Sequence, residues 1–299
     1  MIRQASAVTF MLLPSLLVGG CAWLGRGNAN TAPAAIQVVI GPPYQSGGMW
    51  HYPRNFDSYN KTGLGIIIPQ GHEATTTDGE IFSQSALTAE NPVLPLPSLV
   101  RLTDLVNGRA IVVRVNDRGP MQSGRLIAVT RKVAKLLGFP RGGVVEVRVQ
   151  LLVRRSAALR ASIRRPTQIV AVPIATVQAR ALPPPPGAAG TAGNIANAIR
   201  HKFSSQLTQA RTSLTGRIEN AAPDPGPLYV SINGFGSVPD AYGIRARLGT
   251  MPAGIVQVQG TDRSLYTIRV GPYHSVTAAD SAFRRVLDLG IPNPEITVR

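Results

Sequence analysis

Asp117 and Glu80 carry carboxyl groups, the type of side chain that can exchange protons with a substrate. Asp117 follows the apolar run of residues 110–115 and precedes Arg118-Gly119-Pro120, so it is expected at the end of a strand. There the strand fixes its backbone, and its side chain stays accessible. A partly buried carboxyl group in such a place can have the raised pKa that a general acid requires. Each residue also has a structural interpretation. Asp117 is then a turn residue that caps local N–H groups, and Glu80, after the turn signal Asp78-Gly79, is a solvated hairpin carboxylate.

Short strands and one brief helix are predicted around these two carboxyl groups. The apolar runs with strand character are residues 98–103, 110–115 and 144–152. Asn107-Gly108 is a hairpin signal between the first two runs, and residues 130–137 fit a helix that Gly138 ends. Many short strands with a single helix favour a small β-barrel over residues 43–152.

The last part of the chain, residues 227–299, has its own alternation of strands and helices. The expected elements are a strand, a helix, two strands, a helix and a strand at residues 228–235, 239–248, 255–259, 265–271, 275–289 and 296–298. The order β-α-β-β-α-β is the ferredoxin-like pattern, an α+β arrangement. The sequence therefore predicts two folded domains of different class.

The segment between them, residues 153–226, differs in composition and charge. The whole chain has 31 Lys and Arg against 15 Asp and Glu, a formal charge of +16, and this segment alone carries a net +8. It contains four consecutive prolines, which cannot donate backbone hydrogen bonds and favour an extended spacer. We therefore expect a disordered, cationic linker. Its charge suits an anionic partner, although compositional bias explains it equally well.

The N-terminus resembles a bacterial lipoprotein signal. An apolar stretch after Arg3 spans about 11 residues, too short for a bilayer, which needs about 20. Val18-Gly19-Gly20-Cys21 resembles a lipobox, and Cys21 is the only cysteine of the chain. These features predict a signal peptide over residues 1–20 and a tether over 21–42. Acyl groups on Cys21 would then anchor the chain to a membrane. The alternative is an ordinary signal peptide with a chance cysteine.

The same features exclude several classes of protein. One cysteine permits no internal disulfide framework and no Cys-rich metal site, and four scattered histidines suggest no His-based one. We expect no cofactor and no metal. Because an exported chain meets little nucleic acid, we also expect no nucleic-acid partner. Ala22, which is not aspartate, favours the outer over the inner membrane by resemblance to lipoprotein sorting, with the chain on the periplasmic face.

An ordered series of motifs in residues 43–152 resembles the rare lipoprotein A family of septal-ring lytic transglycosylases. The motifs are Asp78-Gly79-Glu80-Ile81-Phe82, Ala86-Leu87-Thr88-Ala89, Leu94-Pro95-Leu96-Pro97-Ser98, Val115-Asn116-Asp117-Arg118-Gly119-Pro120 and Gly124-Arg125-Leu126-Ile127. The resemblance implies a double-psi β-barrel. It also implies cleavage of peptidoglycan glycan strands to 1,6-anhydro-muramyl ends, without water, during cell division. One carboxyl group can serve such a reaction as acid and then as base.

The resemblance places Asp117 and Glu80 at the family's two acidic active-site positions. His72, Asn91 and Arg118 are the further residues we expect to contact substrate. Three positions depart from the family pattern, because Asn91 stands where the family has histidine, residues 65–71 lack its Trp-Tyr pair, and Ala128 replaces an aspartate. Asparagine cannot exchange a proton near neutral pH. A catalytically degenerate lipoprotein that binds septal glycan as an adaptor is therefore the alternative function.

The last domain resembles a SPOR domain. Tyr229-Val230 with Phe235, and the more specific Arg269-Val270-Gly271-Pro272-Tyr273, carry the resemblance. It implies binding to glycan strands stripped of stem peptides at the division septum, where divisome proteins are further candidate partners. Ser231, in place of a common glutamine, and Arg269 are the expected contact residues. The alternative is a ferredoxin-like domain without this specificity.

Overall fold

The computed structural model of the protein describes residues 36–140, 143–164, 214–259 and 264–299. They form a β-barrel region and, from Leu228 onward, an α+β region. Among the described residues, no helix combines the length and the apolar character that crossing a membrane requires. The predicted signal peptide, Cys21 and the four consecutive prolines lie outside the described residues.

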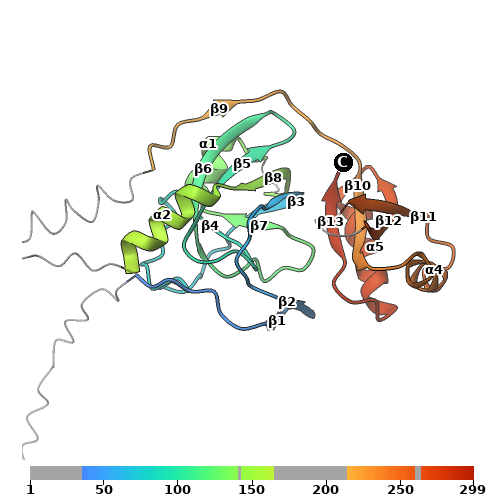
Figure 1. Cartoon of the computed structure of the whole chain (residues 1–299). Helices are drawn as coiled ribbons and strands as arrows, with labels where there is room; N and C mark the ends of the chain where they lie inside the picture. Colours follow the sequence, from blue (N-terminus) through green and yellow to red (C-terminus); the bar gives the residue numbers. More distant parts are fainter. Residues whose placement is uncertain (1–35, 141–142, 165–213, 260–263) are drawn as a thin grey trace, which may run out of the picture. The chain divides into compact units, whose positions relative to one another are not determined.

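Six strands close into a barrel in the order β4-β7-β3-β8-β5-β6, and a pairing between β4 and β6 completes the ring (Figure 1). The strands are β3 (Asn60–Ile67), β4 (Thr88–Glu90), β5 (Ser98–Asp104), β6 (Arg109–Asp117), β7 (Ile127–Val129) and β8 (Val145–Leu151). The β3–β7 and β4–β6 pairs are parallel and the other pairs are antiparallel. The small barrel expected from the sequence is confirmed.

Alternating apolar side chains fill the barrel, as the two-residue period of a strand requires. The buried core includes Ala89, Val100, Leu102, Ile111, Val113, Val115, Ile127, Val129, Val147 and Val149. The predicted hairpin joins β5 and β6, where Asp104 Oδ1 accepts the N–H of Val106 at 2.9 Å. Helix α1 (Arg131–Leu137) buries Val133, Ala134 and Leu137 and ends at Gly138, as predicted.

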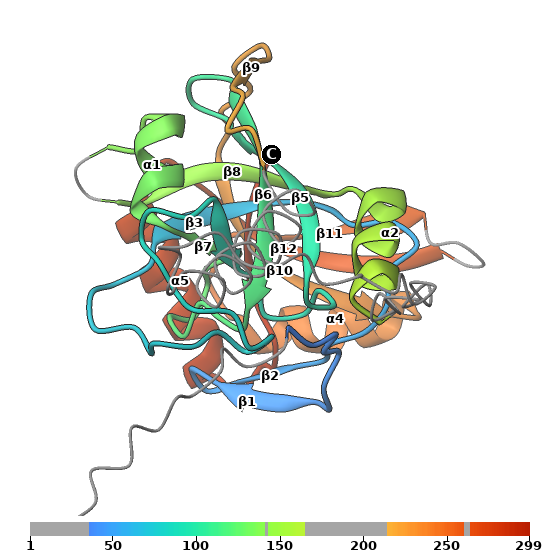
Figure 2. The same cartoon turned by 90° about the vertical axis from the view of Figure 1, so that its left-hand side faces the viewer.

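Short elements flank the barrel. Strands β1 (Tyr44–Ser46) and β2 (Met49–His51) form a separate hairpin before it, and β9 (Glu219–Asn220) pairs with the start of β6. Helix α2 (Val153–Arg164) occupies the start of the predicted linker, and Figure 2 shows α1 and α2 at the two ends of β8. Ser156 Oγ accepts the N–H of Leu99 at 2.9 Å, which ties α2 to β5. The barrel region therefore extends past residue 152, and residues 165–213 lie outside the described part.

The α+β region has the predicted ferredoxin-like order. Its elements are β10 (Leu228–Phe235), α4 (Val238–Arg247), β11 (Ala253–Gln259), β12 (Ser264–Tyr273), α5 (Val276–Asp288) and β13 (Glu295–Val298). The antiparallel sheet has the order β11-β12-β10-β13. Ser237 and Ser275 cap the two helices by accepting backbone N–H groups.

Helices α4 and α5 cover one face of this sheet. Their buried side chains share a core with alternate residues of the strands, namely Leu228, Val230, Ile232, Ala241, Ile268, Val270, Ala279, Phe283, Val286, Ile296 and Val298. Because neighbouring strand residues point to opposite faces, Tyr229, Ser231 and Arg269 belong to the other face. The predicted fold classes of both domains are thus confirmed.

Candidate active site

A groove of about 590 Å³ on the barrel brings together two carboxyl groups from neighbouring strands. Glu90 is the last residue of β4 and Asp117 is the last residue of β6. The strands are parallel, and their register sets Glu90 directly opposite Asp117 after an irregularity that follows Ala89. Both carboxyl groups therefore leave the barrel at the same edge and line the same groove.

His72 links the two carboxyl groups from the segment after β3. Its Nε2 atom lies 3.1 Å from Glu90 Oε1 and 3.1 Å from Asp117 Oδ2. Its Nδ1 atom lies 2.9 Å from the carbonyl oxygen of Glu73, which can only accept, so Nδ1 carries a hydrogen and donates it. Nε2 and two carboxyl groups then need at least one proton among them. Either His72 is an imidazolium that donates to both, or one carboxyl group is protonated.

Asp117 is held by three hydrogen-bond donors on one oxygen. Its Oδ1 atom accepts the backbone N–H of Thr77 at 2.9 Å, the hydroxyl of Thr77, and the backbone N–H of Arg118 at 2.8 Å. These three bonds fix the orientation of the carboxyl group. Asp117 thus caps local N–H groups, as its structural interpretation predicted, and still presents Oδ2 to the groove.

Glu90 is in a different environment. The residue is only 5% exposed, and burial raises the pKa of its carboxyl group to about 7, with the Asp117 charge raising it further and His72 opposing both. Gly119 lies against it, because a Cβ atom at Gly119 would overlap Glu90 Oε2. Sequence reasoning missed Glu90, which stands directly before the Asn91 that departs from the family pattern. Only the pairing of β4 with β6 reveals it.

Glu80 belongs to a separate cluster. It forms an ion pair with Arg114 and accepts a 2.7 Å hydrogen bond from Asn116, whereas the Asp117 groove does not include it. Asp78 lies beside it, and burial together with the Glu80 charge raises the pKa of Asp78 to about 6. The structure therefore does not bring Glu80 together with Asp117. Its catalytic role stays a prediction.

The comparisons with known proteins agree with the two folded domains. The family model for lytic transglycolases matches residues 59–149, and the SPOR domain model matches residues 224–296. A curated relative from Pseudomonas aeruginosa (strain UCBPP-PA14), named endolytic peptidoglycan transglycosylase RlpA, is 30% identical over 270 residues, which cover 84% of this chain and 75% of the relative. The chain belongs to the RlpA family.

Other relatives match a shorter part of the chain at higher identity. An RlpA from Yersinia pestis is 47% identical over 94 residues, covering 30% of this chain and 26% of the relative. One from Neisseria meningitidis serogroup A is 40% identical over 87 residues, or 29% and 36% of the two chains. The resemblance to the rare lipoprotein A family that the sequence motifs indicated is confirmed.

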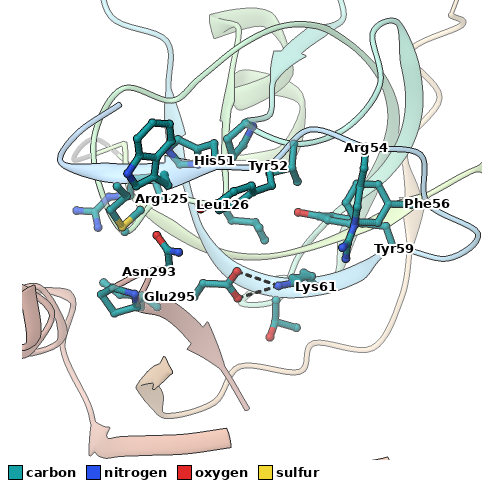
Figure 3. A pocket seen from close by; sticks show the side chains of 18 residues that line it. His51, Tyr52, Arg54, Phe56, Tyr59, Lys61, Arg125, Leu126, Asn293 and Glu295 are labelled. Carbon is teal, nitrogen blue, oxygen red and sulfur yellow. Dashed lines mark hydrogen bonds and ion pairs between the residues drawn. The ribbon is translucent and has the colours of Figure 1, made fainter. Parts of the chain in front are cut away.

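Asn91, at the position where the RlpA family has histidine, does not line the groove. It is fully buried, and its Nδ2 atom donates to the carbonyl oxygen of Leu126 at 3.1 Å and to the Tyr59 hydroxyl at 3.4 Å. Tyr59 and Leu126 line a different pocket, where Figure 3 shows Tyr59 beside Phe56. The hydrogen bonds of the Asn91 side chain therefore stabilise the loop that follows β4. Its contact with substrate stays a prediction.

Arg118 lines the groove, but its guanidinium group donates hydrogen bonds to backbone carbonyl oxygens. Nη1 donates to the carbonyl oxygens of Leu94 at 2.5 Å and Asn91 at 3.3 Å, and Nη2 donates to that of Ile40 at 2.5 Å. The side chain thus joins two backbone segments, the loop of Asn91 and Leu94 and the segment of Ile40, beside Asp117. Among the groups that sequence analysis selected in the barrel, His72 and Asp117 are thus the pair that the groove brings together.

In the SPOR domain, the two predicted contact residues are direct neighbours. Ser231 of β10 pairs with Arg269 of β12, on the face opposite the helices. The Ser231 and Thr297 hydroxyl oxygens lie 2.7 Å apart, and Ser231 is buried. Arg269 Nη1 has no hydrogen-bond partner among the described residues. That atom is buried, whereas the Arg269 side chain as a whole is only half-buried.

Proposed function

We propose that this chain is an endolytic lytic transglycosylase that cleaves the glycan strands of peptidoglycan to 1,6-anhydro-muramyl ends. The observation that carries the proposal is the pair of carboxyl groups, Glu90 and Asp117, that face one groove and share His72. Membership in the RlpA family supports the same reaction, since the curated relatives carry this activity in their names.

The reaction needs only proton transfer and charge stabilisation. The bond between the muramyl anomeric carbon and the bridging oxygen breaks as that oxygen takes a proton from a carboxyl group. The muramyl 6-hydroxyl oxygen then bonds to the anomeric carbon, and its proton returns to the same carboxylate. Water does not enter the product. A second, ionised carboxylate stabilises the positive charge that develops on the sugar ring.

Digestion of purified glycan tests this function directly. The full chain is incubated with glycan strands freed of stem peptides, and the products are analysed by mass spectrometry for anhydro-muramyl ends. We expect such ends with the wild-type chain and none with Asp117→Asn. The exposed Asp57 does not line the groove, so Asp57→Asn serves as the matched control. Retained glycan binding without anhydro ends would instead support the adaptor function.

The SPOR domain provides the second part of the proposed function. We propose that the helix-free face of its sheet binds glycan strands that lack stem peptides, with Arg269 donating to sugar or lactyl oxygens. The matched SPOR model and the half-buried position of Arg269 on this face support this binding. Such strands are expected at the division septum, where divisome proteins are candidate partners. Sedimentation of the full chain with denuded and intact sacculi measures the preference, and equal binding to both would contradict it.

We also propose that the chain is anchored to the periplasmic side of the outer membrane through acyl groups on Cys21. The lipobox-like Val18-Gly19-Gly20-Cys21 and the absence of aspartate at Ala22 support this location. Metabolic labelling with a fatty acid tests it, because Cys21→Ser should abolish incorporation. Fractionation of the two membranes then reports where the labelled wild-type chain resides.

A further inference from the structure

We propose that Glu90 is the catalytic acid and base of this barrel, and that His72 is the residue that positions its proton. The inference rests on the proposed lytic transglycosylase function and names a residue that the sequence motifs did not select. Its basis is geometric. Glu90 ends a strand, lines the groove, faces Asp117 across a parallel pair and lies 3.1 Å from His72 Nε2.

The two carboxyl groups differ in what holds them. Asp117 Oδ1 accepts three donors, which fix this side chain in place. The side chain of Glu90 has a single polar partner within the described part of the chain, His72, and it is almost fully buried. Burial disfavours its ionised form, in agreement with its raised pKa of about 7. Glu90 therefore suits the group that gives up and regains a proton, while Asp117 suits the group that stabilises positive charge.

His72 is fixed in the orientation that this role requires. Its ring stacks on Phe82 with 4.1 Å between the ring centroids, and Nδ1 donates to the Glu73 carbonyl oxygen. In the neutral ring, Nε2 is then an acceptor that points at the Glu90 carboxyl group. A proton on Glu90 Oε1 is thus held between the two residues and near Asp117. Asn91, the next residue in the chain, has a side chain that cannot exchange a proton. Glu90 supplies the exchangeable proton instead.

Glu90 alone accounts for both proton transfers of the step. The protonated carboxyl group gives its proton to the bridging oxygen as the bond from that oxygen to the anomeric carbon breaks. The 6-hydroxyl oxygen forms a bond to the anomeric carbon, and its proton passes to the Glu90 carboxylate. Glu90 ends the cycle protonated, as it began. The charge of Asp117 stays constant throughout.

The experiment compares the full-length wild-type chain with Glu90→Gln, Glu90→Asp and the Asp57→Asn control on peptide-free glycan across a pH series. We expect Glu90→Gln to lose about 100-fold or more in kcat/KM, the usual range for a lost acid–base group, while the protein stays folded and still binds glycan. Glu90→Asp should retain part of the activity. A wild-type rate for Glu90→Gln would overturn the proposal.

Loss of wild-type activity in EDTA, restored by Mn²⁺ or Zn²⁺, would also overturn the proposal. One donor atom each from His72, Glu90 and Asp117 lies within 4.8 Å of the other two, so these residues would then hold a metal.

The pH profile distinguishes positioning from a structural role for His72. Since the acid form of Glu90 is required, the wild-type rate should fall as pH rises through about 7. His72 lowers the pKa of Glu90, so His72→Gln should shift this fall to higher pH. An unchanged profile with a lower rate would remove His72 from the role.

A second measurement separates this inference from the proposed function. Carboxyl-carbon NMR of labelled wild-type protein, with Glu90→Gln to identify the signal, reports the protonation of Glu90 without any turnover. If no anhydro ends form but Glu90 titrates near pH 7, the result contradicts the cleavage function and supports Glu90 as a group that holds a proton. Titration in the ordinary range of a glutamate would overturn the site itself.

Discussion

Asn116 and Asp117 are adjacent in the chain, yet their side chains serve two different carboxyl clusters. Asn116 Nδ2 donates to Glu80 Oε2 at 2.7 Å, whereas Asp117 Oδ2 lies 3.1 Å from His72 Nε2. Arg114, two residues before Asn116, pairs with the same Glu80. Side chains alternate between the two faces of β6. Arg114 and Asn116 therefore contact Glu80 in a structural network, whereas the Asp117 carboxyl group points into the groove.

This separation predicts that Glu80 acts on stability. Arg114 is buried, so Glu80→Gln leaves its positive charge without its nearest counter-ion. Breaking such a pair costs roughly 3 kcal/mol of unfolding free energy, measurable by urea denaturation, with little change in cleavage per folded molecule. Asp57→Asn controls for the loss of one negative charge. Full stability with abolished cleavage would instead support the catalytic role that the sequence resemblance implied for Glu80.

Glu90 should make the stability of the barrel depend on pH. Its pKa is raised from 4.5 in the unfolded reference to about 7 in the fold, so the folded state binds more protons between these values. Its favourable contribution is therefore complete below pH 4.5 and is lost as pH rises through about 7. We expect Glu90→Gln to reduce the decline in Tm between pH 5 and pH 8. An identical decline in both proteins would contradict this linkage.

Gly119 should be required for the position of Glu90. Its φ of +147° is unfavourable for other residues, and a Cβ atom there would overlap Glu90 Oε2. Gly119→Ala should displace the carboxyl group and lower cleavage by about tenfold or more, a loss of at least about 1.4 kcal/mol of transition-state stabilisation. Gly48, with a φ of +74° and open space around it, provides the matched control for backbone strain. Equal activity of Gly119→Ala and Gly48→Ala would exclude the crowding effect.

Arg269 should contribute to glycan binding, because its half-buried guanidinium group lies on the helix-free face of the sheet. A hydrogen bond from a charged group is worth about 1.5–3 kcal/mol, so Arg269→Ala should weaken sedimentation of the full chain with denuded sacculi about tenfold or more. Arg284 is exposed on α5, the helical side of the domain, and Arg284→Ala removes the same charge there. If both variants lose binding equally, general charge attraction rather than this face of the sheet is responsible.

Local patterns in the sequence were sufficient for much of the fold. Alternating apolar residues predicted β5, β6 and β8, and Asn107-Gly108 predicted the hairpin between the first two. The six elements of the SPOR domain follow from the same rules, because strand and helix periods, caps and glycine stops act over a few residues. Helix α2 was missed, since its packing depends on hydrogen bonds between Ser156 and Leu99, which is far away in sequence.

The composition of the active site was decided by tertiary structure. From the Ala89–Val115 pair, a regular register would set Asn116 opposite Glu90, but the irregularity in β6 brings Asp117 there instead. Neither the parallel pairing nor this one-residue shift has a local sequence signal, because barrel closure joins strands that are distant in the chain. The sequence by itself predicted that Asp117 ends a strand, and its motifs selected His72 as a further site residue. Only the closed barrel decided that Glu90, rather than Glu80, is the carboxyl group they meet.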